Sequence, residues 1–468
     1  MKYRLALAPV AALALAVIAG CGSTPDPSPT SSGSPEVNPG RAVVYWTTFN
    51  TPERLAKLER VRDEFKQTTG IDVEIVGLTA ADINQAIVSG AAAGDLPDVV
   101  GADMNQVALW RAQDLLNVDA VQEVIGELGE STFNASAMRF ISYEEGPVAV
   151  PTDGWGQMLF YRKDLLAQAG LDAPESLDEL VAAAQALNSP ERAGIVLGNL
   201  PGDGLTNQTL EWLSLANGCE LLTRGEATLD SKNCEEVYST YTKLIEASVA
   251  GAQDVTTTRE AYLSGRAAMI SWSPHLLDEI AGVDPNFPLT CSECVEDPGF
   301  LSANTGVVMG LSGPSDPNGQ LYGATLNQVI LSKDNVKNSQ AFVSFLLDEG
   351  YESFLSVVPE GRFPMRTGTS QDPEKFVNLW ATLPIGADPT NQKTILDAFG
   401  DDFLVAVARG ATEFSRWGFA EKEGPLVASV VAGGALTPGQ EAISAGLPAA
   451  EIAAAFQERV AAEVAAAR

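Results

Sequence analysis

The chain reads Ala42-Val43-Val44-Tyr45-Trp46 at residues 42–46, Ile71-Asp72-Val73-Glu74-Ile75-Val76 at 71–76 and Pro97-Asp98-Val99-Val100 at 97–100. Each run has the composition of a buried strand. Helical spacing of Leu55, Leu58, Val61 and Phe65 predicts a helix over 53–68 that Gly70 ends, and a second helix is predicted over 81–92. This alternation of strand and helix predicts an α/β fold with a parallel, doubly wound sheet. Ligands of such sheets bind outside the carboxyl ends of the strands, which points to Trp46 and the loop 101–105.

The rest of the body continues with mixed elements. A strand at 148–151 leads into a polar loop at 152–156, and an apolar run follows at 158–161. Helices are expected at 178–186, 210–216, 235–250 and 339–347, with further strand segments at 267–272 and 323–331. The last hundred residues favour helices and end in an alanine-rich segment at 449–467.

The first 21 residues have the layout of an export signal. Lys2 and Arg4 precede an apolar run over 5–19, which is short for a membrane span. The run ends in Ile18-Ala19-Gly20-Cys21, which resembles a bacterial lipobox. That resemblance implies cleavage of residues 1–21 and a lipid on Cys21; the alternative is an ordinary signal peptide with an incidental cysteine. Residues 22–41 are rich in Ser, Pro, Thr and Gly and predict a disordered tether.

Composition narrows the ligand class. The chain of 468 residues has 61 acidic and 29 basic residues, a net charge of −32, and a mean hydropathy near zero. Such an acidic surface repels phosphate backbones, so we expect no nucleic-acid partner. It also argues against an anionic substrate and favours a neutral ligand. No run after the signal approaches membrane-spanning length.

Four cysteines remain after Cys21, and they allow three pairings. Proximity in sequence favours Cys219 with Cys234 and Cys291 with Cys294, and an oxidising compartment favours structural disulfides. The alternative for Cys291-Ser292-Glu293-Cys294 is a redox or zinc motif. The one histidine, His275, lies outside any zinc-ligand spacing, so we expect no metal site.

Four motifs in order resemble a known family. The first is Gly94 to Val100. The second runs from Val150-Pro151 through residues 159–166 and is followed by Ala169-Gly170-Leu171. The third is Ala261 to Trp272, and the fourth is Phe363-Pro364-Met365-Arg366. Together they resemble the carbohydrate-binding branch of the extracytoplasmic solute-binding proteins of ABC importers, the maltose and multiple-sugar type. One departure is Arg162, where the family usually has asparagine, and we expect it to affect packing more than function.

The resemblance implies a periplasmic-binding-protein-like fold of type II, with two doubly wound α/β lobes joined by a hinge that the chain crosses several times. Lobe 1 would hold 42–151 and 328–362, and lobe 2 would hold 152–327 and 363–468. The ligand would lie between the lobes, and lobe closure would present the complex to the transmembrane subunits of a permease. The expected protein is a monomer without cofactor, held by its lipid at the outer face of the cytoplasmic membrane.

Sugar rings present apolar faces and a belt of hydroxyl groups, so a sugar site needs aromatic planes with carboxylates and amides beside them. Trp110, Trp212 and Trp380 lie in helical patterns and are expected in the core. Arg366 would either bind ligand or brace the hinge. The candidate ligand contacts are Trp46, Asp103, Asp153, Trp155, Trp272, Thr325, Asn327, Arg366 and Trp417.

Two other functions compete with transport. An exported glycosidase would need an acid–base pair such as Asp98 and Asp103, but Asp98 fits the strand motif. The sequence has no Gly-x-Ser-x-Gly, His-Glu-x-x-His or phosphate-loop motif, so we expect no enzyme. A binding lipoprotein that feeds a sensor is the second alternative. The identity of the sugar is left open.

Overall fold

The computed structural model describes residues 37–386, 388–410, 413–419 and 422–467. Residues 37–468 form one unit with its own core. The predicted signal peptide, Cys21 and most of the predicted tether lie outside the described residues. Within the described ranges, no helix has the length and apolar composition needed to cross a membrane.

The first lobe is built on the predicted strand–helix alternation. Its elements start with β1 (Val43–Thr47), α1 (Pro52–Thr69), β2 (Val73–Gly77), α2 (Ala80–Ala93) and β3 (Val99–Asp103). β1 pairs in parallel with both β2 and β3, which confirms the predicted sheet. The Thr51 side chain caps α1, and Gly70 ends it in the left-handed conformation at φ 75°.

Asp98 has a structural role in this sheet. It is buried, and its Oδ2 accepts hydrogen bonds from Val44 N and Asn335 Nδ2, both at 2.9 Å. The carboxylate therefore joins the strand motif to a distant segment of the first lobe. The remaining elements of this lobe are α3 (Met104–Ala112), α4 (Val118–Leu128), η1 (Glu130–Thr132), α5 (Ala135–Ile141), β4 (Ser142–Tyr143), β5 (Gly146–Pro147), α14 (Val336–Leu347) and α15 (Tyr351–Leu355).

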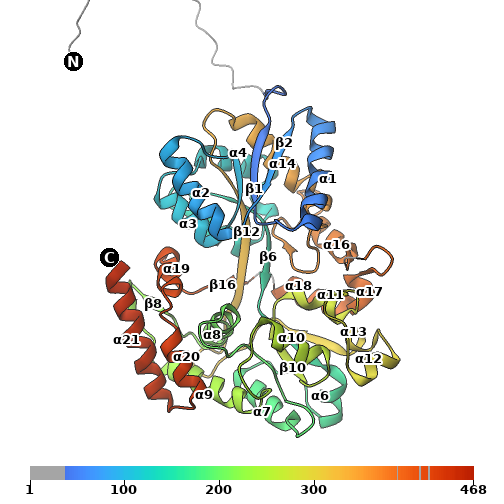
Figure 1. Ribbon diagram of the computed structural model, residues 1–468, viewed down its shortest axis with the longest axis vertical. Coiled ribbons are helices and arrows are strands. Elements are labelled where there is room, and N and C mark those ends of the chain that lie inside the picture. The colour runs from blue at the N-terminus through green and yellow to red at the C-terminus, as the bar shows by residue number, and fades with distance from the viewer. Residues whose placement is uncertain (1–36, 387, 411–412, 420–421, 468) are drawn as a thin grey trace, which may run out of the picture. The chain divides into compact units, whose positions relative to one another are not determined.

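Two antiparallel strands connect the lobes. β6 (Val150–Gly156) and β12 (Leu321–Ile330) run side by side from the first lobe into the second (Figure 1). β3 and β13 (Phe363–Pro364) flank this pair, β16 (Phe414–Ser415) pairs with the start of β12, and the strand order is β13-β6-β12-β3-β1-β2. The β6–β12 register shifts between Leu326 and Asn327, so an irregularity lies in the middle of the crossing.

The second lobe has a smaller sheet of β10 (Met269–Trp272), β7 (Met158–Arg162) and β11 (Thr305–Val308). These strands are antiparallel, and isolated parallel bridges join Ala193 to Ala267 and Val196 to Ile270. The α/β class is as predicted, but the strands of this second sheet do not repeat the parallel arrangement of the first.

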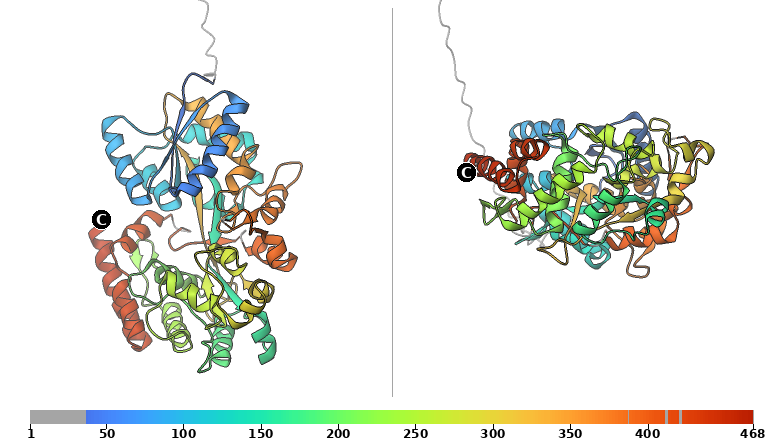
Figure 2. Two further views of the ribbon diagram at one scale, coloured as in Figure 1. Left: turned by 45° about the vertical axis from the view of Figure 1, so that its right-hand side comes forward. Right: turned by 90° about the horizontal axis from the view of Figure 1, so that it is seen from below.

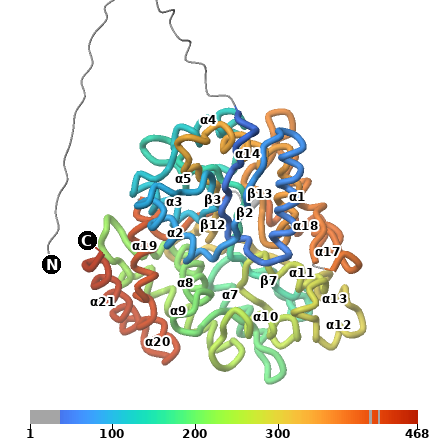
Figure 3. The backbone as a smooth tube through the Cα atoms, turned by 45° about the horizontal axis from the view of Figure 1, so that its top comes forward, coloured from blue at the N-terminus to red at the C-terminus, as the bar shows by residue number. Residues whose placement is uncertain are grey.

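Helices cover the second sheet and continue to the C-terminus. α21 lies along the outer side of the second lobe (Figure 2), and α19 packs beside α3 of the first lobe (Figure 3). The elements are α6 (Lys163–Ala169), α7 (Leu177–Leu187), α8 (Gly204–Ala216), β8 (Leu222–Thr223), β9 (Glu226–Ala227), α9 (Lys232–Glu246), α10 (Val255–Leu263), η2 (Pro274–Leu276), α11 (Leu277–Ile280), α12 (Ser292–Glu296), α13 (Phe300–Asn304), α16 (Lys375–Thr382), β14 (Pro384–Ile385), β15 (Lys393–Thr394), α17 (Ile395–Phe399), α18 (Asp401–Gly410), α19 (Gly424–Ala432), α20 (Thr437–Ser444) and α21 (Ala449–Ala467).

The hydrophobic core has two clusters, and they do not divide at the hinge. The first cluster holds the first-lobe sheet and continues into the second lobe through Phe160 and Ile270. The second cluster packs Leu159 and Met269 against α7, α9 and the C-terminal helices. Neighbouring residues of a strand point to opposite faces, so β7 contributes to both clusters.

Two segments pack differently from the predicted borders. Residues 38–41 fall within the predicted tether, yet Asn338 Nδ2 donates to the carbonyls of Asn38 and Arg41 at 2.9 and 2.7 Å. Residues after 363 fall within the predicted second lobe, yet Phe376 packs edge-on against Tyr351 of α15 and Arg366 bridges to Phe133. The segment that follows residue 363 therefore still packs against the first lobe.

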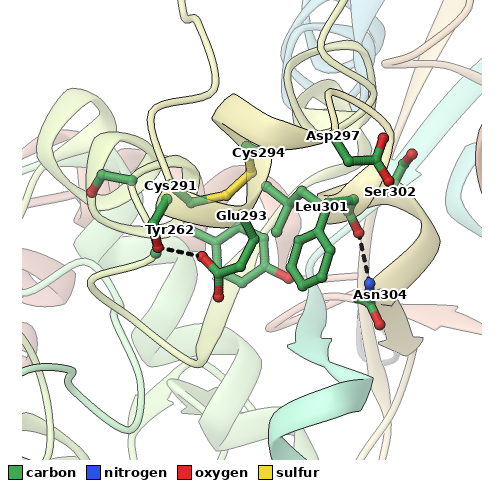
Figure 4. Close-up of a disulfide and its surroundings, with 12 residues drawn as sticks. Tyr262, Cys291, Glu293, Cys294, Asp297, Leu301, Ser302 and Asn304 are labelled. Atoms are coloured by element: carbon green, nitrogen blue, oxygen red, sulfur yellow. Dashed lines mark hydrogen bonds between the residues drawn. A yellow bond between two sulfur atoms is a disulfide. The ribbon is translucent and has the colours of Figure 1, made fainter.

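Both suggested disulfides are present, Cys219–Cys234 and Cys291–Cys294. Figure 4 shows the second beside Tyr262 and Leu301, with Glu293 in the turn between the cysteines. Arg162, the departure from the family pattern, is buried and forms ion pairs with Asp164 at 2.7 Å and with Glu293 at 3.1 Å. It therefore ties β7 to the disulfide turn, a packing role as expected.

Candidate ligand-binding site

The sheet register brings several of the predicted residues together where β6 and β12 cross. Asp103 at the end of β3 pairs with Leu326, and Leu326 pairs with Asp153 of β6. Trp155, two residues after Asp153 on β6, pairs with Ala324 of β12. The register thus aligns three distant segments beside the hinge, at the carboxyl end of β3, where a doubly wound sheet binds ligands.

Asp153 is fixed in place by a buried ion pair. Its Oδ1 accepts from Arg362 Nη1 at 2.8 Å and its Oδ2 accepts from Thr152 Oγ1 at 2.9 Å. The Asp153 side chain is 2% exposed and that of Arg362 is 17% exposed. The guanidinium lies 5.3 Å from the centroid of the Phe49 ring. Arg362, which no sequence motif indicated, therefore presents the charged and partly exposed end of this pair.

Trp155 belongs to an aromatic wall. Its ring is half-buried, edge-on to His275 at 6.4 Å and tilted against Tyr322 at 5.7 Å. Arg416 lies 4.6 Å over the Tyr322 ring and is paired with Glu211 at 2.7 Å. His275, Tyr322 and Arg416 come from three other segments, and no spacing in the sequence places them beside Trp155.

Thr325 and Asn327 lie inside the hinge. Both are buried, and Asn327 Nδ2 donates to the carbonyls of Ala102 and Thr325 at 3.3 Å. Among the described residues, Thr325 Oγ1 and Asn327 Oδ1 have no hydrogen-bond partner. Asn327 adjoins the register shift, so its polar side chain spans the irregular part of the β12 ladder.

Asp103 and Trp46 lie at the edge of this group. Asp103 caps α3, with Oδ1 accepting from Asn105 N at 2.8 Å and Gln106 N at 2.9 Å. Trp46 is half-buried near the end of β1, where it pairs with Val100, and packs against the first core cluster.

Three predicted residues lie elsewhere, in contact with protein. Arg366 is buried and donates to Leu347 O, Leu128 O, Thr132 Oγ1 and Asp348, so it braces the first lobe. Trp417 is 1% exposed and donates through Nε1 to Cys219 O at 2.7 Å. Trp272 is 7% exposed on β10, with the Arg259 guanidinium 5.5 Å from its ring centroid. Their burial leaves Arg366 and Trp417 no surface for a ligand in this conformation, so we leave both out of the proposed site.

A cavity of about 290 Å³ opens beside His275. Glu53, Arg54 and Lys57 of α1 line one wall with Glu360, and the wall contributed by the second lobe carries Arg259, Asp278, Glu279 and Asp284. Five carboxyl groups and three cationic side chains thus face the cavity.

His275 is held neutral in this place. Burial, and then the charges of Arg362, Arg54 and Arg259, lower the pKa of its imidazole to about 3. Gly361 makes the close packing possible, because a Cβ there would lie 2.2 Å from His275 Nε2. A neutral imidazole beside the Trp155 ring can pack on an uncharged ligand and exchange hydrogen bonds with it.

The family follows from comparison with known proteins. A family model described as bacterial extracellular solute-binding protein matches residues 50–290. The chain belongs to this family. A putative ABC transporter periplasmic-binding protein of Escherichia coli strain K12, YcjN, is 27% identical over 303 residues, which are 63% of this chain and 66% of that protein.

Solved structures of other binding proteins share the fold. The sugar-binding protein MalE of Xanthomonas citri gives a TM-score of 0.68 at 17% identity, covering 92% of this chain and 98% of that one. UgpB of Mycobacterium tuberculosis, solved with glycerophosphocholine, gives 0.65 at 16% identity over 91% and 99%. At this identity the comparison shows the two-lobe architecture alone.

Proposed function

We propose that this protein is a lipid-anchored binding protein that captures a neutral sugar between its lobes and delivers it to the permease of an ABC importer. Membership of the solute-binding family and the two-lobe fold support the binding role. The ligand class rests on His275, which lines the cavity, and on the half-buried Trp155 ring that packs edge-on against it. Aromatic planes suit the apolar faces of a sugar ring.

A neutral ligand fits the charges around the cavity. Arg362 is paired with Asp153 and Arg259 with Glu279, so neither guanidinium is an unpaired positive charge. Carboxylates outnumber cations on the cavity walls. A phosphate-bearing ligand such as that named for UgpB would find the Arg362 and Arg259 guanidiniums already paired with carboxylates.

Delivery would depend on hinge closure. A ligand that contacts both Trp155 and the first-lobe wall would bind the closed form more tightly than the open form. It would shift the equilibrium toward the closed form by no more than this difference in affinity. β6 and β12 provide the crossing about which the lobes would turn. The lipid on Cys21 and release to a permease rest on the sequence and the family, and an exported glycosidase or a sensor-feeding protein are the alternatives.

A thermal-shift screen of the purified protein against a panel of neutral sugars tests the ligand class. A cognate sugar at 100 times its Kd should stabilise the protein by about 2.7 kcal/mol. Trp155→Ala removes the stacking plane and should abolish the shift. Tyr143→Ala, which removes a half-buried aromatic side chain stacked on Arg111, is the matched control and should retain it.

The outcomes separate the alternatives. A shift that persists unchanged in Trp155→Ala would remove Trp155 from the site. The absence of any sugar shift in the wild type would contradict the neutral-sugar proposal. Turnover of a chromogenic glycoside by the purified protein would establish the glycosidase alternative instead.

A further inference from the structure

Three carboxylates gather on the second-lobe wall of the cavity. Asp278 and Glu279 lie on α11, and Asp284 follows in the next loop. One oxygen of each lies within 4.8 Å of the others, and among the described residues this is the group of His, Cys, Asp or Glu side chains that could share a metal ion. Neither the family nor the proposed sugar site accounts for this arrangement.

Each carboxylate has one oxygen held by protein. Asp278 Oδ1 accepts from Glu279 N at 2.9 Å, and Asp284 Oδ1 accepts from Asn286 N at 2.7 Å. Glu279 Oε1 accepts from Arg259 Nη1 at 2.6 Å. These bonds orient the three groups, and they leave the second oxygen of each carboxylate for another ligand.

Glu279 supplies an independent sign of a missing partner. Its side chain is 4% exposed, and its Oε2 is buried without a hydrogen-bond partner among the described residues. A buried carboxylate oxygen without a partner is costly, and the cost is several-fold larger for a charge than for a neutral group. Arg259 already bonds the other oxygen, and a bound cation would give the open oxygen the partner it lacks.

We propose that Asp278, Glu279 and Asp284 bind one divalent cation of the calcium type. Calcium takes six to eight oxygen ligands at about 2.3–2.6 Å, so two oxygens on one ion lie at most about 5 Å apart. The separation of the three oxygens meets this limit. The cavity offers an entry path and room for water to complete the shell. Carboxylates in flexible geometry suit calcium better than magnesium, which demands a near-ideal octahedron.

The ion would act between the lobes. Glu53 of α1 and Glu360 line the first-lobe side of the same cavity. A cation on α11 would offset the repulsion that Asp278 receives from Glu360. Calcium would therefore favour the approach of the two walls whether or not a sugar is present.

Calorimetric titration of EDTA-treated protein with CaCl₂ tests the proposal. We expect one ion per chain with a Kd on the order of 10⁻⁴–10⁻³ M, the range of extracellular calcium modules. Glu279→Gln and Asp284→Asn should each weaken binding by at least about tenfold. Glu296→Gln, which removes one exposed carboxylate from the neighbouring α12, should bind calcium like the wild type.

Asp284→Asn keeps the test decisive if Glu279→Gln fails to fold, because Asp284 is only partly buried. Wild-type protein without saturable calcium binding, or both variants with wild-type affinity, would overturn the proposal. Magnesium bound as tightly as calcium would overturn the assignment of the ion. The sugar screen in EDTA is a separate readout, so a failed calcium site leaves the sugar proposal standing.

Discussion

Burial decides the charge of His275. The imidazole lies among Arg362, Arg54 and Arg259, and each guanidinium adds to the effect of desolvation in lowering its pKa to about 3. The sequence shows a single histidine and gives no sign of this environment. The arginines come from three segments that only the folded chain brings together.

The lowered pKa of His275 predicts how stability depends on pH. The unfolded chain protonates this histidine below its ordinary pKa of 6.5, whereas the folded chain does so only near 3. The unfolded state therefore binds more protons between these values, and the free energy of unfolding falls as the pH falls, by up to about 1.4 kcal/mol per pH unit from this group. Asp278 and Glu279, whose pKa values are raised, act in the opposite direction above their unfolded values.

Urea unfolding of wild type and His275→Gln between pH 4.5 and 6.5 isolates this contribution. On acidification the free energy of unfolding of the wild type should change less favourably than that of the variant, because glutamine does not titrate. Equal slopes for the two proteins would show that His275 protonates in the folded state at its ordinary pKa.

The sequence predicts which residues lie near the hinge more readily than it predicts what their side chains contact. The motif of Trp155 and Asp153 predicts a place beside the hinge, and the sheet register puts them there. The sequence places Asp153 in a polar loop, yet its side chain forms a buried ion pair with Arg362, 209 residues away. Trp417 illustrates the opposite case, because its motif favours a ligand contact and its packing buries it against Cys219.

At the scale of elements, the two disulfides close loops of very different length. Cys219–Cys234 joins the segment after α8 to α9 and has a sequence separation of 15, whereas Cys291–Cys294 has a separation of 3. A cross-link stabilises mainly by restricting the unfolded chain, and the restriction grows with loop length. We therefore expect unequal contributions.

Replacing Cys219 and Cys234 by serine together should lower the free energy of unfolding by about 3 kcal/mol. Replacing Cys291 and Cys294 in the same way is the matched control, with an expected loss of about 1.6 kcal/mol from its shorter loop. Denaturant unfolding measures both. A larger loss from the second pair would show that loop length does not set the order of the two contributions. It would indicate instead that the contact of Glu293 with Arg162 depends on this turn.

The geometry of the hinge also depends on how whole strands align. The sequence predicts strands near 148–151 and 323–331, but it contains no sign of the register shift at Leu326 and Asn327. Such a shift depends on how two strands some 170 residues apart align, and no local pattern encodes that alignment.

At the scale of the whole molecule, the core is continuous across the hinge. Val150 of the first-lobe sheet and Phe160 of the second lobe lie in one cluster, and β6 and β12 run through both lobes. Any motion between the lobes would therefore have to bend β6 and β12 where they pass through this continuous core. The acidic cavity lies beside it, lined by both lobes.

The proposed lipid anchor would determine where the whole molecule is located. If the lipobox resemblance of residues 18–21 holds, Cys21→Ser should move the protein from the membrane fraction to the soluble extracytoplasmic fraction in a lipid-modifying bacterial host. The reason is that buried acyl chains supply about 0.8 kcal/mol per methylene. Immunoblots of the fractions measure this, with Ser23→Ala expected to stay in the membrane. A Cys21→Ser protein that remains membrane-bound would contradict the anchor.

The sequence by itself determined the alternation of strands and helices, the family, and the cysteine pairs that proximity favoured. Apolar periodicity, turn residues and ordered motifs are local, and they survive without the fold. Only the tertiary structure decided which aromatic rings meet at Trp155 and which arginines neutralise Asp153 and Glu279. These contacts join segments tens to hundreds of residues apart, so packing between distant elements sets them.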